Sequence, residues 1–199
     1  MPAKMSSSDA SRHETEVKVP CCDLDTVRET LKLHGARKIA DGLERNIVFD
    51  TPSGKLAESD CLLRLRSYNG GVLTYKGPRQ DQSGEIKTRS EIEVGVADFD
   101  AACELFLALG FKRTWAYEKF REIWSLGSAE VMLDTLPLLG GFVEVEAQGP
   151  DEVASAMAVI GLADHRCDTR TYAEIFRDFT RDDYSQFRDL VFEENLHDE

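Results

Sequence analysis

The feature that most constrains this chain is a two-residue alternation of charged and uncharged side chains, first seen in HETEVKVP at residues 13–20. In an extended strand, successive side chains point to opposite faces. Glu14, Glu16 and Lys18 therefore share one face, and the threonine and valines between them share the other. The stretch predicts a strand with one densely charged face and one mostly apolar face.

The same alternation recurs in later segments rich in strand-forming residues. Its charged members are Arg64, Arg66, Lys76, Arg89, Glu91, Glu93, Lys119, Arg121, Asp134, Glu144 and Glu146. The predicted strands span residues 43–50, 61–68, 72–77, 88–96, 117–126, 129–136 and 138–147. Asn69-Gly70 supplies the positive φ values of a tight hairpin between two of them. Any one segment is most simply a solvated sheet face with cross-strand ion pairs, but together they predict one shared charged face.

Amphipathic helices are available to cover the apolar side of these strands. Asp23 is a candidate N-cap for a helix that ends near Gly35. Residues 97–113 align without gaps with residues 22–38, and residues 150–162 form a fainter third copy. Each copy follows a strand-like stretch, so the pattern predicts a repeated strand-then-helix unit.

Antiparallel strands with a common face tend to curl or close, because closure removes unpaired edges. With helices outside, the charged face would line the lumen of an α+β fold. Lysine and arginine hold a polyanion, and the planar arginine fork suits phosphate. Carboxylates beside a polyanion repel it unless a divalent cation bridges them, as Mg²⁺ does between carboxylates and substrate phosphates. The mixed lining therefore predicts a metal–polyphosphate site.

Composition and charge limit the partners and the cellular compartment that we expect for this protein. The formal net charge of −13 and the pI near 4.8 exclude nucleic-acid binding through the general surface, which needs a basic footprint. Five cysteines without a C-x-x-C pair are typical of reduced thiols in a cytosolic protein. The polar N-terminus carries no signal-peptide pattern, and no apolar run approaches the length of a membrane span. We therefore expect a cytoplasmic protein without a nucleic-acid or membrane partner.

The ordered motifs ETEVKV, LLRLR, TYKGP, TRSEIEV, KFREIW, MLDTLPLLGGFVEVE and TYAEIF resemble the CYTH superfamily, or triphosphate tunnel metalloenzymes, over about residues 13–179. The resemblance implies an eight-stranded antiparallel β-barrel with flanking helices, whose tunnel binds a triphosphate-bearing small molecule with Mg²⁺ or Mn²⁺. The resemblance does not fix the oligomeric state, and a homodimer stays an alternative. The expected organisation is a disordered segment at residues 1–12, a tunnel domain at 13–180 and a C-terminal helical extension at 181–199, where residues 182–193 have helical apolar spacing.

The same resemblance implies roles for individual residues. The metal-site carboxylates are Glu14, Glu16, Asp134, Glu144 and Glu146. The triphosphate-binding residues are Lys18, Arg64, Arg66, Lys76, Arg89, Lys119 and Arg121, of which Lys18, Lys76 and Arg121 are the catalytic candidates. In the empty tunnel these cations would repel one another, with partial compensation by the glutamates. Glu91 and Glu93 are expected to hold basic residues in place, and Tyr172 matches an aromatic position without an assigned role.

Within the superfamily, TYKGP, a polar loop and TRSEIEV most resemble the class IV adenylyl cyclase-like branch. This implies conversion of ATP to cyclic AMP and pyrophosphate. Some cyclases of this class carry a His-Phe pair before the opening motif, and SSSDASRH has none. The alternative is a triphosphatase that hydrolyses thiamine triphosphate, inorganic triphosphate or nucleotides. The number of inward carboxylates argues against a third alternative, a non-catalytic polyphosphate sensor.

Overall fold

Strands dominate the chain. The computed structural model describes residues 12–13, 15–68, 70–78, 90–180 and 189–192. Its strands are β1 Arg12–His13, β2 Thr15–Pro20, β3 Arg37–Asp50, β4 Leu62–Ser67, β5 Gly71–Lys76, β6 Ser90–Val96, β7 Lys112–Leu126, β8 Ala129–Leu136 and β9 Gly140–Ala147. Its helices are α1 Leu24–Leu33, α2 Lys55–Glu58, α3 Phe99–Ala108, α4 Pro150–Val159 and α5 Tyr172–Phe179.

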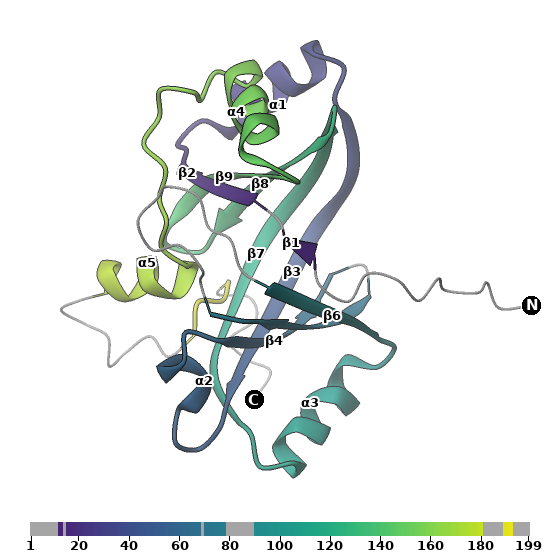
Figure 1. The fold of residues 1–199 in the computed structure, drawn as a ribbon, viewed down its shortest axis with the longest axis vertical. Coiled ribbons are helices and arrows are strands. Elements are labelled where there is room, and N and C mark those ends of the chain that lie inside the picture. Colours follow the sequence, from purple (N-terminus) through teal and green to yellow (C-terminus); the bar gives the residue numbers. More distant parts are fainter. Residues whose placement is uncertain (1–11, 14, 69, 79–89, 181–188, 193–199) are drawn as a thin grey trace, which may run out of the picture.

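All the strands belong to one antiparallel sheet in the order β1-β6-β5-β4-β3-β7-β8-β9-β2. The sheet curls around the long, paired strands β3 and β7, which run through the length of the molecule (Figure 1). β1 pairs with β6 and β2 pairs with β9, so both edges of the sheet end on the same N-terminal segment. Counted as one N-terminal strand, β1 and β2 give the eight antiparallel strands expected, and the α+β fold is confirmed.

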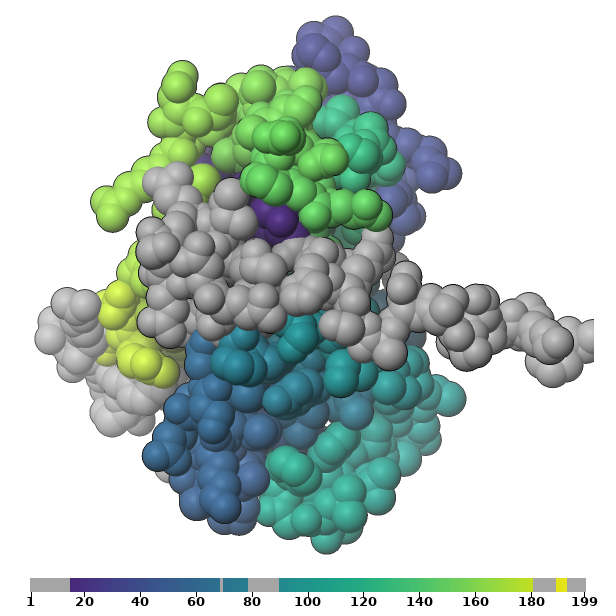
Figure 2. All heavy atoms as spheres, in the orientation of Figure 1, coloured from purple at the N-terminus to yellow at the C-terminus, as the bar shows by residue number. Residues whose placement is uncertain are grey.

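Helices α1, α3 and α4 cover the apolar outer face of the sheet, as the sequence predicts. One cluster of buried hydrophobic residues lies under α1 and α4, where Val17 and Val19 of β2 pack with buried residues of both helices. A second cluster joins Leu63 and Leu65 of β4 to α3. In the space-filling view the green residues around α4 cover the upper part of the molecule, and blue to teal residues form the lower part (Figure 2).

Local capping fixes where the helices begin. The Asp23 side chain accepts a hydrogen bond from the Thr26 N–H at 3.0 Å, which confirms the predicted cap of α1. Asp98 caps α3 in the same way, so the two aligned segments form equivalent capped helices. α5 begins with a reciprocal capping box between Thr171 and Glu174. This box fixes the position of Tyr172, the first residue of the helix.

Two strands are longer than the sequence pattern predicts. β3 begins at Arg37 rather than residue 43, and β7 begins at Lys112 rather than residue 117. The two strands pair with each other from end to end, with irregularities in register at two points. Tertiary pairing therefore extends both strands beyond the stretches whose side chains alternate.

The predicted helix at residues 182–193 is wrong where it can be compared. Residues 189–192 are not helical, and Leu190 forms an isolated parallel bridge with Tyr117. Leu190 is fully buried, and its backbone exchanges hydrogen bonds with Ala116 and Glu118 of β7. Burial against β7 thus outweighs the helical spacing of the segment. The rest of the proposed C-terminal helix and nearly all of the N-terminal segment 1–12 lie outside the described residues.

The five cysteines form no disulfide with one another. Within the described ranges, no helix combines the length and apolar character that a membrane crossing needs.

Candidate active site

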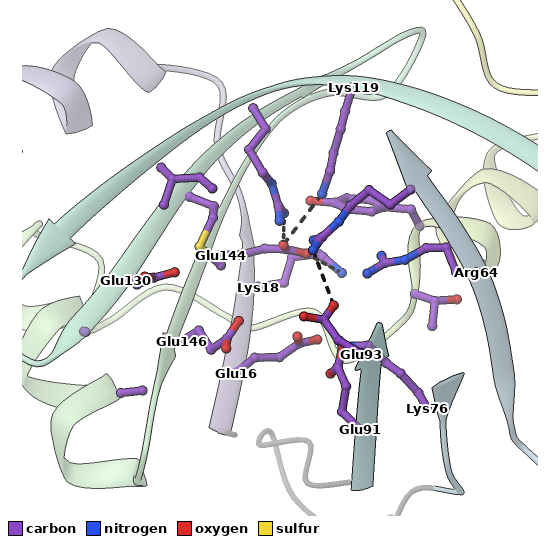
Figure 3. A pocket seen from close by; sticks show the side chains of 18 of the residues that line it. Glu16, Lys18, Arg64, Lys76, Glu91, Glu93, Lys119, Glu130, Glu144 and Glu146 are labelled. Atoms are coloured by element: carbon purple, nitrogen blue, oxygen red, sulfur yellow. Dashed lines mark hydrogen bonds and ion pairs between the residues drawn. The ribbon is translucent and has the colours of Figure 1, made fainter. Parts of the chain in front are cut away.

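A polar cavity of about 520 Å³ lies on the inner face of the curled sheet (Figure 3). The predicted site residues on its wall are Glu16, Lys18, Arg64, Arg66, Lys76, Lys119, Arg121, Glu144 and Glu146. Glu91, Glu93 and Tyr172 line it as well. Side chains scattered from one end of the sequence to the other thus meet in one cavity, as the alternation predicts. Glu14 and Arg89 lie outside the described residues, so their predicted roles stay predictions.

Strand register places the acidic part of the wall. Glu16 of β2 pairs directly with Glu146 of β9, and Glu146 pairs in turn with Glu130 of β8. Directly paired side chains on one face of a sheet have Cβ atoms about 5 Å apart. The three carboxylates therefore form a continuous row across neighbouring strands (Figure 3). Lys18 and Glu144 form the adjacent row, one alternation step deeper.

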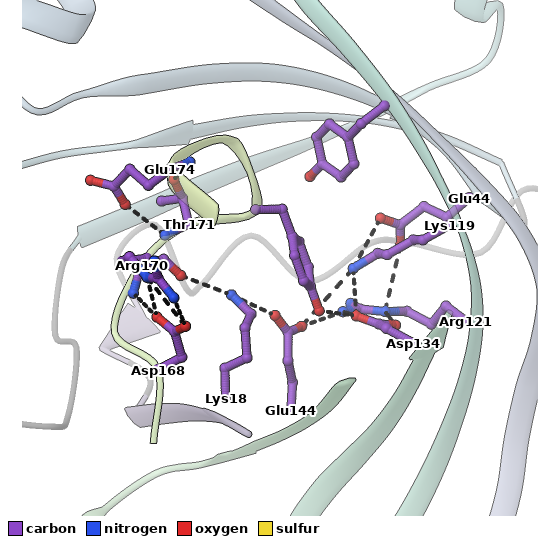
Figure 4. Close-up of polar contacts among 12 residues, drawn as sticks. Lys18, Glu44, Lys119, Arg121, Asp134, Glu144, Asp168, Arg170, Thr171 and Glu174 are labelled. Carbon is purple, nitrogen blue, oxygen red and sulfur yellow. Dashed lines mark hydrogen bonds and ion pairs between the residues drawn. The ribbon is translucent and has the colours of Figure 1, made fainter. Parts of the chain in front are cut away.

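A buried cluster of ion pairs lies at the basic part of the wall (Figure 4). Asp134 is fully buried and accepts hydrogen bonds from Lys119 Nζ at 2.9 Å and from Arg121 Nε and Nη2 at 2.7 and 2.6 Å. The Tyr172 hydroxyl donates to the same carboxylate at 2.8 Å. Asp134 is behind the lining rather than in it. Its carboxylate holds the two cations in place, and its predicted role as a metal ligand is untested.

Lys18 and Glu144 form a second buried pair. The Lys18 ammonium is 3.1 Å from Glu144, donates to the Arg170 carbonyl at 3.2 Å, and lies 4.1 Å above the centre of the Tyr172 ring. Burial disfavours the charge on Glu144, but Lys18, Lys119 and Arg121 outweigh burial and hold the pKa of Glu144 well below its usual range. Burial likewise opposes the charge on Lys18, but Glu144 and Glu16 raise its pKa. Both groups are therefore ionised at neutral pH.

Tyr172 has a definable role in the structure. It is buried between Asp134 and Lys18: its hydroxyl donates a hydrogen bond to Asp134, and its ring face contacts the Lys18 ammonium. Burial, reinforced by Asp134 and Glu144, raises the pKa of Tyr172 well above its usual value, so the hydroxyl stays a donor. The first residue of α5 thus supports the charged wall and closes part of the cavity.

Strands β4 and β5 carry cations that are more exposed than Lys119 and Arg121. Lys76 is 2.7 Å from Glu91, and Arg66 Nη2 is 3.3 Å from Glu93. These contacts confirm the expectation that Glu91 and Glu93 hold basic residues. Arg64 donates to the Tyr117 hydroxyl at 3.2 Å. Among the described residues, the buried Nε atoms of Arg64 and Arg66 have no hydrogen-bond partner.

Sequence reasoning missed three polar residues of this site. Glu130 continues the alternation backwards from Asp134 through Met132, a signal that was present in AEVMLD. Glu44 and Asn46 share the inner face of β3, where the Asn46 amide donates to Glu44 at 3.0 Å. They gave no comparable signal because the residue between them is also charged.

Glu44 gives the stability of the protein a predicted pH dependence. Burial disfavours its charge, but Lys119, Arg121 and Arg64 outweigh burial and lower the pKa of Glu44 from 4.5 to about 2. Because the folded pKa is the lower one, this contribution to the free energy of unfolding is complete above the unfolded pKa and is lost as the pH falls toward 2. Urea unfolding at several pH values from about 6 to 3 should show a shallower acid loss in Glu44→Gln than in wild type. Equal losses in both proteins would contradict this assignment.

The comparisons with known proteins agree with this geometry. The model of the CYTH domain family matches residues 12–166. A protein of Methanocaldococcus jannaschii, provisionally named as an adenylate cyclase, is 37% identical over 134 residues, which cover 67% of this chain and 75% of that protein. Adenylate cyclase CyaB of Aeromonas hydrophila is 29% identical over 174 residues, which cover 81% of this chain and 87% of that protein.

A solved structure extends the likeness to the fold. A Hippeastrum protein, provisionally named as an adenylyl cyclase and described as having a dominant triphosphatase activity, matches with a TM-score of 0.67 at 16% identity. The match covers 84% of this chain and 96% of that chain. Together with the family match across residues 12–166, the curled antiparallel sheet and its charged inner wall, these likenesses show that the chain belongs to the CYTH family.

Proposed function

We propose that this protein is a metal-dependent enzyme that binds ATP by its triphosphate in the cavity and forms cyclic AMP and pyrophosphate. The observation that carries the proposal is the division of one cavity wall between buried, fixed cations and a row of carboxylates (Figure 3). Cations alone would suffice to bind an anion. Carboxylates beside them repel the same anion, and they are useful when a divalent cation joins them to phosphate oxygens.

The cations would bind and orient the triphosphate. Lys119 and Arg121 are already held in place by Asp134, so they stabilise charge on phosphate oxygens with little rearrangement. Arg64 and Arg66 of β4 line the same cavity. A polyphosphate bound there would be within reach of cations from both β4 and β7. In cyclisation the ribose 3′-hydroxyl attacks the α-phosphorus, and the leaving pyrophosphate carries the charge that these cations stabilise.

The acidic row fits a magnesium or manganese ion. Glu16 and Glu146 supply hard oxygen donors from neighbouring strands at the cavity wall, with Glu130 in the same row. The described residues do not form a preassembled cluster of three metal-ligating groups. Mg²⁺ does not need one, because it is usually bound by one or two carboxylates together with substrate phosphates and water. When bound, the ion would polarise a phosphate oxygen and lower the pKa of an attacking oxygen.

Glu144 and Asp134 are less suited to direct metal binding. Asp134 is saturated by donors from two cations and a tyrosine, and Glu144 is paired with Lys18 and Arg121. Their charges keep the cations in position. We therefore place the metal on the side of Glu16 and Glu146 and the phosphates on the side of Lys119 and Arg121.

Cyclisation is favoured over hydrolysis by the names of the two sequence relatives, one an adenylate cyclase and the other provisionally named as one. Triphosphate hydrolysis is the second candidate, because the Hippeastrum protein of similar fold is described as mainly a triphosphatase and because the opening motif here lacks a preceding His-Phe pair. In that reaction, water would attack the terminal phosphorus of a substrate bound to the same cations.

Product analysis separates the two reactions. The protein should be incubated with ATP, thiamine triphosphate and inorganic triphosphate, each with Mg²⁺ and with Mn²⁺. Cyclic AMP and pyrophosphate in equal amounts from ATP would support the cyclase proposal. Release of inorganic phosphate without cyclic AMP would replace it with the triphosphatase. No turnover of any of the three compounds would overturn the proposed function.

A further inference from the structure

The Glu44 carboxylate lies on the inner face of the sheet, next to Lys119 (Figure 4). In the β3–β7 pairing Glu44 is directly opposite Lys119. It is 0% exposed and does not line the cavity, whereas Lys119 does. Its Oε1 atom is 3.5 Å from Lys119 Nζ, and its Oε2 atom is 3.9 Å from Arg121 Nε. One buried carboxylate is thus close to both cations of the basic wall.

Asp134 and Glu44, the two carboxylates that hold these cations, differ in how many hydrogen bonds they accept. The Oδ2 atom of Asp134 accepts from Lys119, Arg121 and Tyr172 together. Glu44 Oε1 accepts from the Asn46 amide, while Oε2 has no hydrogen-bond partner among the described residues although it is buried. A buried oxygen left without a donor is costly, and native proteins seldom retain one without a use. Packing alone therefore does not account for a glutamate at this position.

We propose that Glu44 is a positioning residue that keeps Lys119 and Arg121 in the orientation needed for reaction. This inference rests on the proposed function. Asp134 lies on one side of Lys119 and Glu44 on the other, so the ammonium is held between two fixed charges. When a polyanion draws the cations into the cavity, Asp134 alone would have to restrain both. Glu44 supplies the second restraint, and its Oε2 can accept a donor that shifts during binding.

The same carboxylate also repels the substrate, since its negative charge lies close to the cations that bind phosphate. Removing the charge should therefore have opposite effects on two measurable steps. Affinity for a polyphosphate should rise, because one repulsive charge is gone while both cations remain. Turnover should fall, because the cations are less well held at the reacting phosphate. A residue needed only for folding would lower both quantities together.

The test compares wild type with Glu44→Gln, which keeps the shape and the acceptor for Asn46. Binding of inorganic triphosphate is measured calorimetrically in EDTA, where no metal-dependent turnover occurs. We expect binding about fivefold tighter in the variant and kcat with ATP or another turned-over triphosphate roughly tenfold lower. Glu44→Asp, which keeps the charge, should return the affinity toward that of wild type.

The matched control is Glu118→Gln. Glu118 is also a buried, ion-paired glutamate, one residue from Lys119, but it contacts Arg45 and the Phe192 N–H instead of the cavity cations. It should leave affinity and kcat unchanged even if it lowers stability. Weaker triphosphate binding in Glu44→Gln, or unchanged affinity and kcat, would overturn the positioning role. Absence of turnover in wild type would overturn the proposed function, and weaker triphosphate binding by Glu44→Gln in EDTA would separately overturn the role of Glu44.

Discussion

Replacing Arg66 by alanine is expected to slow turnover of the triphosphate by about a hundredfold, the usual cost of removing one fixed charged donor from a reacting centre, while the melting temperature stays near that of wild type. Arg66 lines the cavity, and its only described ion pair, with Glu93, is partly exposed and 3.3 Å long. Such pairs contribute little to stability. Charge develops on phosphate oxygens as the reaction proceeds, so the loss falls mainly on the transition state.

Lys119→Ala provides the contrast. Lys119 is 2% exposed, and it is the partner of two fully buried carboxylates, Asp134 and Glu44. Breaking a buried ion pair by removing one partner typically costs about 3–5 kcal/mol of folding stability. Turnover and melting temperature should therefore fall together in this variant, while Arg66→Ala loses turnover alone. Steady-state kinetics and thermal unfolding of both variants check this. Equal loss of stability in the two would contradict the division between a buried, structural cation and an open one.

This contrast also shows where sequence reasoning reached its limit. The alternation in residues 13–20 and 138–147 predicted β2, β9 and their charged inner faces, because a strand that packs on helices must place its charges on the opposite side. It could not show that cations of the cavity are already paired with carboxylates of the protein. The expected repulsion among them does not hold for Lys119 and Arg121, which share the buried Asp134.

Residues that depend on tertiary pairing were the least predictable. Glu44 becomes part of the site because β3 pairs with β7 in a register that sets it opposite Lys119. Arg45, between Glu44 and Asn46, is charged too, so the segment shows no apolar face that would mark its orientation. The motif TYAEIF drew attention to Tyr172, but the contact of this residue with Asp134 depends on how α5 packs against the sheet. Such contacts follow from topology rather than from local pattern.

The second large effect is expected at the acidic row. Glu16→Gln should reduce turnover by two orders of magnitude or more, about the loss expected for a group that acts on charge at the reacting centre. An amide is an uncharged and poorer ligand for Mg²⁺ or Mn²⁺ than a carboxylate. The side chain keeps its size and is at the cavity wall, so the fold should be preserved. Glu29→Gln, on the exposed surface of α1, is the matched control and should behave as wild type.

Titration of Mn²⁺ into the protein with a non-hydrolysable ATP analogue tests most directly whether metal and triphosphate share this cavity. Electron paramagnetic resonance reports the free and bound ion, and the same titration is run on wild type and on Glu16→Gln. We predict that wild type binds Mn²⁺ beyond what the analogue alone retains, and that Glu16→Gln weakens this binding by about tenfold or more, while the analogue still binds in EDTA. Equal Mn²⁺ affinity in the two proteins would contradict the metal site and with it the division of the cavity between carboxylates and cations.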